Sequence, residues 1–101
     1  MWGRSRFGKL VDMQLDLFLR DNRADLTEVH ERLAAYNRAD RTEAEELYGD
    51  YVDTVDALAE ALAEMRDRYA QTVDDPDGYV RAFNRGAARR LPEVSRDLEN
   101  R

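Results

Sequence analysis

Residues 36–48 read YNRADRTEAEELY, and they separate two rows of mostly apolar positions that mirror each other. Each row advances in steps of three and four residues, the spacing of one face of an α-helix. The sequence therefore predicts two helices joined by a turn within residues 38–41. The first row contains Val11, Leu15, Leu19, Asn22, Leu26, Val29, Leu33 and Tyr36, and the second contains Ala44, Tyr48, Tyr51, Val55, Leu58, Leu62, Met65 and Tyr69.

The two rows also match each other in register. If they are paired across an antiparallel hairpin, the residue numbers of facing positions add to 80 or 81 at every step, from Tyr36 with Ala44 to Val11 with Tyr69. Two independent helices have no reason to follow this rule. We therefore expect the two arms to pack against each other along their whole length, as in a coiled coil. Asn22 would face Leu58, where a buried amide fixes the register.

The predicted fold is all-α, with one domain covering residues 1–101. We expect helices at about residues 7–37, 42–73 and 76–91, with residues 93–101 loosely ordered. Asp25 and Glu28 fit a capping box, so a break near residues 22–25 is an alternative to one continuous first helix. The unbroken apolar row favours continuity. Asp40 or Thr42 can cap the second helix, and Pro76 fits the first turn of the third.

A second apolar face lies on the first helix, opposite Leu15, and a hairpin alone cannot cover it. We expect the third helix to cover this face within one chain. The alternative is a homodimer in which two hairpins form a four-helix-type bundle, and the two arrangements are compatible. The face consists of Leu10, Met13 and Leu17, and the residues expected to cover it are Tyr79, Phe83 and Leu91.

Charge is distributed unevenly along this acidic chain, whose net charge is −6. Residues 1–24 carry +2, residues 25–77 carry −11 and residues 78–101 carry +3. The acidic side chains of the second helix fall on its solvent side. On the third helix, Arg81, Arg85 and Arg89 form a basic stripe opposite Phe83, which we expect to contact protein. Nucleic acid is not expected, because the stripe is short and lacks an accompanying binding motif.

Three polar residues near the apolar rows are candidates for structural or ligand-binding roles. Arg66 lies level with Gln14, and we expect it to form an ion pair with Asp12 or Asp16. His30 is the only histidine. A bundle that binds a metal or small ligand around His30 and Asn22 is therefore an alternative function. Di-iron bundles use Glu-x-x-His pairs on facing helices, which this sequence lacks, so we predict no metal and no cofactor.

Catalytic motifs are missing from the sequence. There is no cysteine, the two serines lie near the chain ends, and the glycines do not form a phosphate-binding loop. With 43% hydrophobic and 38% charged residues, the composition suits long amphipathic helices. The longest apolar stretch is far shorter than the roughly 20 residues of a membrane span. We predict a cytoplasmic protein that is not an enzyme.

Together these features predict a non-enzymatic module for protein–protein interaction or assembly. Its partner would be a second copy of the chain, giving a homodimer, or another protein. The predicted partner-binding residues are Leu10, Met13, Leu17, Tyr79, Phe83, Arg81, Arg85 and Arg89.

Overall fold

The computed structural model describes residues 6–96 and 98–101, and all regular structure in these residues is helical. The elements are α1 (Gly8–Asp21), α2 (Arg23–Arg38), α3 (Ala44–Ala70), α4 (Pro76–Arg90), α5 (Pro92–Ser95) and the 3-10 helix η1 (Leu98–Asn100). The predicted all-α class is thus confirmed. The molecule measures 51 × 23 × 22 Å, and its radius of gyration of 15.5 Å exceeds the roughly 13 Å of a compact 100-residue domain.

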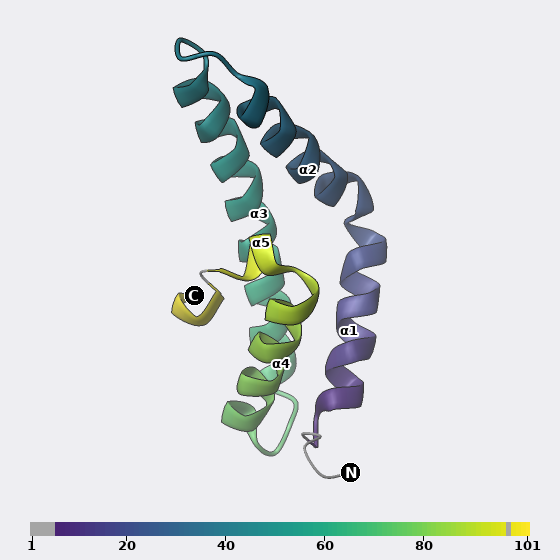
Figure 1. Cartoon of the computed structure of the whole chain (residues 1–101). Helices are drawn as coiled ribbons and strands as arrows, with labels where there is room; N and C mark the ends of the chain where they lie inside the picture. The colour runs from purple at the N-terminus through teal and green to yellow at the C-terminus, as the bar shows by residue number, and fades with distance from the viewer. Residues whose placement is uncertain (1–5, 97) are drawn as a thin grey trace.

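The elongation comes from the hairpin of α2 and α3. These helices pack together and project beyond the remaining helices, as Figure 1 shows. At the tip, the Asp40 carboxylate accepts hydrogen bonds from Thr42 Oγ1 (2.6 Å) and from the Glu43 amide (3.0 Å). These bonds lower the pKa of Asp40, the bond from Thr42 most of all. A carboxylate that accepts such bonds reverses the chain and starts the next helix.

The prediction of one continuous first helix is wrong, because the helix breaks at Asn22. This residue has φ −115° and ψ 25°, outside the helical region, and the axis changes direction between α1 and α2 (Figure 1). The Asn22 Nδ2 atom donates a hydrogen bond of 3.0 Å to the Phe18 carbonyl. Asparagine side chains compete in this way for backbone groups and favour helix ends. The alternative of a break near residues 22–25 therefore describes the chain better.

The break changes the packing at the open end of the hairpin. The helix α2 packs along α3, whereas α1 packs mainly on α4. A methyl group built on Gly86 of α4 would lie 2.9 Å from Val11 Cγ1 and 3.1 Å from Leu15 Cδ1, so only glycine allows this close approach. The expected pairing of Val11 with Tyr69 does not describe this end, since Tyr69 is 40% exposed and Val11 packs at Gly86.

One apolar core joins α1, α3, α4 and the C-terminal segment. Its largest fully buried side chains include Leu15, Leu62, Tyr79, Phe83 and Leu98. The expectation of loose order after residue 93 is wrong, since α5 and η1 form there and Val94 and Leu98 are buried. Burying these two side chains offsets the entropy lost when the tail is ordered.

Arg66 holds this tail in place. This residue is 3% exposed, and its guanidinium group donates hydrogen bonds to the carbonyls of Leu98 (2.8 Å) and Arg101 (2.8 Å) and to Asn84 Oδ1 (3.1 Å). Its Nε atom also pairs with Asp67. The expected ion pair with Asp12 or Asp16 is therefore wrong. Those two residues contact Arg90 instead, Asp12 through its carbonyl and Asp16 through its carboxylate.

A buried hydrogen bond connects α1 to α4. The Tyr79 hydroxyl donates to Gln14 Oε1, and both side chains are buried. Gln14 Nε2 has no hydrogen-bond partner in the described part of the chain. A buried polar pair of this kind favours one alignment of two helices over its alternatives.

The same tyrosine predicts a loss of stability in alkaline solution. Burial raises the pKa of Tyr79 to about 12, whereas an exposed tyrosine has a pKa of about 10. The unfolded chain therefore releases this proton first, so stability falls as pH rises from 10 towards 12. We expect a loss of about 2 kcal/mol in the free energy of unfolding by about pH 11.5, measured with urea. An equally steep decline in Tyr79→Phe would contradict this assignment.

Candidate interaction surfaces

The structure separates the predicted partner-binding residues into three groups, of which the first is buried. Tyr79 and Phe83 are both 0% exposed and belong to the core. The Tyr79 ring packs edge-on against Phe7, with ring centroids 5.7 Å apart. These two residues are therefore not available to a partner on the surface of the folded chain.

The second group is the outer side of α1. Met13 and Leu17 are 58% and 43% exposed, while Leu10 is half-buried against the core. The expectation that the third helix covers this face is wrong, because α4 packs on the Val11 and Leu15 side of α1 instead. The break at Asn22 explains the difference, since it turns α1 away from α3 and makes room for α4 against the first apolar row.

The third group, the basic stripe, lies on the outer side of α4. Arg81, Arg85 and Arg89 are exposed, and among the described residues they form no ion pair. Since α1 and α4 pack together through their buried faces, their outer faces point away from each other. Met13 and Leu17 therefore do not share a surface with the basic stripe, and the eight predicted residues do not form one site.

The alternative site around His30 and Asn22 is not assembled either. His30 is exposed and lines a groove with Asp16, Arg20 and Arg23, whereas Asn22 lines a different groove with Leu58. Within residues 6–96 and 98–101, no group of three or more His, Cys, Asp or Glu side chains is placed to hold a metal ion.

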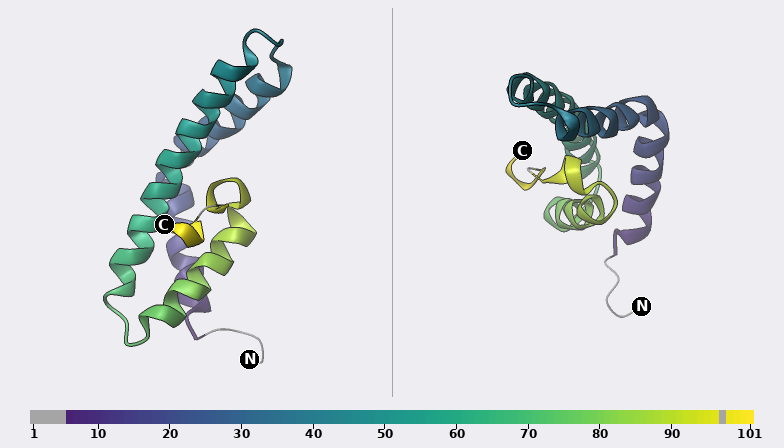
Figure 2. Two further views of the ribbon diagram at one scale, coloured as in Figure 1. Left: turned by 90° about the vertical axis from the view of Figure 1, so that its left-hand side faces the viewer. Right: turned by 45° about the horizontal axis from the view of Figure 1, so that its top comes forward.

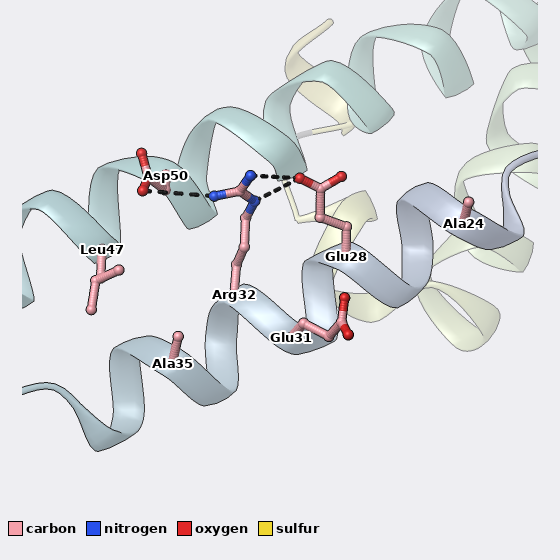
Figure 3. A pocket seen from close by; sticks show the side chains of 7 residues that line it. All are labelled: Ala24, Glu28, Glu31, Arg32, Ala35, Leu47 and Asp50. Carbon is pink, nitrogen blue, oxygen red and sulfur yellow. Dashed lines mark hydrogen bonds and ion pairs between the residues drawn. The ribbon is translucent and has the colours of Figure 1, made fainter.

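The arm, defined as α2 with residues 44–57 of α3, has two different faces. The charged face holds a groove of about 430 Å³, drawn in Figure 3. There, Arg32 donates to Glu28 Oε1 at 2.6 and 2.8 Å and approaches Asp50 at 3.6 Å. The hydrogen bond to Glu28 raises the pKa of Arg32. All three side chains are 38–45% exposed, so solvent screens these pairs and they add little stability.

No known protein-family model, curated protein or solved structure matches this chain. Among the described residues, no helix is both long enough and apolar enough to cross a membrane.

The opposite side of the arm is apolar. Helix geometry places Tyr48, Val52 and Val55 on the side of α3 away from Asp50, at about 100° per residue. These residues line a groove with Asp56 of α3 and with Glu93, Val94 and Arg96 of the C-terminal segment, so this is the side on which α5 lies. On α2, Leu26 and Leu33 lie on the same side, away from Glu28. We call the apolar residues of this surface the arm face: Leu26, Leu33, Tyr48, Val52 and Val55.

The arm face is only partly covered in the folded chain. Tyr48 is 50% exposed and the other four residues are half-buried, Leu26 and Val55 of them against the core. The Tyr48 ring contacts those of Tyr36 and Tyr51, with centroids 5.2 and 6.3 Å apart. Sequence reasoning assigned most of these residues to the hairpin interior. The width of the apolar surface on the second helix was the signal that two helices could not bury all of them.

Proposed function

We propose that this chain is a non-enzymatic protein–protein interaction module and that it binds its partner through the arm face. The observation that carries the proposal is an apolar stripe along α3 that is covered at only one end. Ala59, Ala63 and Ala70 are 2–8% exposed in the part of the stripe near α4 and α5. Tyr48, at the other end, is 50% exposed.

The position of the shorter helices explains this difference. Figure 2 shows that α4 and α5 lie on one side of the hairpin and reach only part of the way along it. Beyond α5, two helices have to bury an apolar surface that elsewhere requires additional helices. As a result, Val29 is the only buried residue of α2. Helices with wide apolar faces commonly complete their packing in a bundle.

The chemistry of the arm face resembles the centre of a protein interface. Such centres are enriched in tyrosine, and a few residues, often aromatic, contribute most of the binding energy. Charged side chains border the arm face, among them Asp56, Glu93 and Arg96 of the same groove. Met13 and Leu17 make a smaller apolar patch, and scattered exposed apolar residues are normal on protein surfaces. The buried polar side chains Gln14 and Arg66 hold helices and tail together, which is a structural role.

Site-specific photo-crosslinking in the native host tests the proposal. A benzophenone amino acid at position 48 should form a covalent adduct with a protein that mass spectrometry identifies. Position 69 is the matched control, because Tyr69 lies on the same helix, is 40% exposed and lies outside the arm face. Absence of an adduct at position 48, or equal adducts at both positions, would contradict the proposed function.

A further inference from the structure

We infer that a groove at the break between α1 and α2 binds a carboxylate of the partner, so that the partner presents an acidic segment to this chain. The inference rests on the proposed function, because this groove adjoins the arm face at Leu26, and it specifies the chemistry of the partner. It is supported by available arginine side chains in the groove, by apolar side chains beside them and by the charge of the whole chain.

The groove has a volume of about 370 Å³ and spans the break, since α1 and α2 both contribute to its lining. Leu19 and Leu26 form its apolar part, and both pack against the core. Arg20, Arg23 and His30 form its basic part, and all three are exposed. An apolar surface beside basic side chains suits a ligand that has both an apolar and an anionic group. We call this site the break groove.

The two arginines of the break groove are available to a ligand. The Arg23 side chain forms no ion pair or hydrogen bond with the described residues. Arg20 approaches Asp21 at 3.5 Å, but these side chains are 67% and 66% exposed, so solvent screens the pair. The Thr27 hydroxyl also lines the groove and has no partner in the described part of the chain, which leaves a further donor for an anion.

One carboxylate, that of Asp16, also lines the break groove. It is paired with Arg90 of α4. This pairing offsets the charge of Asp16, so the groove remains positive. The groove of Figure 3 is different, because its arginine, Arg32, is already bonded to Glu28 and lies 3.6 Å from Asp50.

The charge of the whole chain distinguishes among anions. Its net charge is −6, and residues 25–77 carry −11. A polyanion such as a nucleic acid is repelled by this charge, whereas a single carboxylate is repelled far less. Arginine binds a carboxylate through two parallel hydrogen bonds. Because Leu19 and Leu26 add favourable contacts only with apolar groups, an aspartate or glutamate flanked by apolar side chains is the best complement.

The position of the break groove connects it to the arm face. Leu26 belongs to both, and Leu33, the other arm-face residue of α2, lies further along the same helix. A partner segment that covers both leucines therefore comes close to Arg23. From Leu33 to Arg23 the distance along α2 is roughly 15 Å at 1.5 Å per residue, so the acidic residue of the partner should lie within about 15 Å of its contacts with the arm face.

Photo-crosslinking at position 27 in the native host tests whether the partner reaches the break groove. Thr27 is exposed and lies outside the arm face. A benzophenone amino acid there should form an adduct with the same protein as position 48, and the crosslinked peptide of that protein should contain aspartate or glutamate. Position 31 is the matched control, because Glu31 is exposed on the charged face of the same helix, and it should form no adduct.

Titration of the isotope-labelled full chain, followed by NMR, tests the carboxylate itself. The probe is a blocked helical peptide of leucine, alanine and glutamate, about three turns long. It should shift the amide signals of Arg23 and Thr27 and bind about tenfold more tightly than the same peptide with glutamine in place of glutamate, because hydrogen bonds to charged groups are stronger. The double variant Arg20→Gln/Arg23→Gln should abolish this preference. Arg68→Gln, which changes an exposed arginine on α3, should preserve it.

The outcomes separate the two proposals. An adduct at position 48 without one at position 27, or equal adducts at positions 27 and 31, overturns the acidic contact and leaves the proposed function standing. Equal affinity for the two peptides, or a preference that survives the loss of both arginines, also overturns it. Inorganic phosphate that shifts the same amides at lower concentration than the glutamate peptide would assign the groove to a free anion and overturn the inference as well. Absence of an adduct at position 48 contradicts the proposed function itself, whatever the peptides do.

Discussion

Replacing Phe83 with alanine is expected to lower the free energy of unfolding by about 4 kcal/mol, the typical cost of removing a buried aromatic side chain. Phe83 is 0% exposed and lies in the core beside Tyr79, with ring centroids 6.0 Å apart. The truncation removes apolar contacts and leaves a cavity that α1 and α4 cannot fill without moving. A chain of this length has only about 5–15 kcal/mol of stability, so the change should be easy to detect.

Urea unfolding at one fixed protein concentration measures this effect, because dimerisation would make stability depend on concentration. Met13→Ala is the control. It removes an apolar side chain of similar size that is 58% exposed, and should change stability by less than about 0.5 kcal/mol. Equal effects of the two substitutions would show that Phe83 is not in the core. Phe83 would then again be a candidate for binding a partner at the surface.

Arg66→Ala is expected to cost about 3 kcal/mol and to release the C-terminal segment. The substitution removes the donor for two backbone carbonyls, those of Leu98 and Arg101, which then lie unpaired near an empty space. The amides of Val94 and Arg101, which donate to the carbonyls of Leu91 and Leu98, should lose their protection from hydrogen exchange, while those of α2 keep it. Urea unfolding and hydrogen exchange followed by mass spectrometry measure the two effects.

Arg68→Ala is the matched control for Arg66. It removes an arginine two residues away on the same helix, but this one is exposed. Its effect should stay within about 0.5 kcal/mol. The assignment of Arg66 as the tail anchor fails if exchange at the Arg101 amide is the same in Arg66→Ala as in the wild type, whatever happens to overall stability.

The sequence was most informative where the structure is local and periodic. The apolar spacing of three and four residues predicts the helices, and the stretch around Asp40 predicts the turn, because these features depend on neighbouring residues. The break at Asn22 was foreseen only as an alternative. The apolar row keeps its phase across this residue, so periodicity alone could not reveal that an amide would cap α1 there.

Packing between distant segments was harder to predict. The numbering rule for the hairpin assumes two straight helices, and it failed where α4 replaces α3 as the neighbour of α1. A glycine inside a helix generally indicates only a weaker helix, but Gly86 is the point where α4 approaches Val11 and Leu15. The candidate surface was misplaced for the same reason. The spacing of apolar residues identifies the apolar side of a helix. Which other helix packs against that side depends on the whole fold.

The contact between Arg66 and the tail determines where this chain tolerates change. The donor is a single side chain, but two of its acceptors are main-chain oxygens that every amino acid provides. Exposed tail positions such as Glu99 and Asn100 should therefore tolerate substitution without releasing the tail from Arg66, provided that residue 98 stays apolar. Substitutions at position 66 have no such freedom, so a mutational scan would find the position that most affects the tail outside the tail itself, near the C-terminal end of α3.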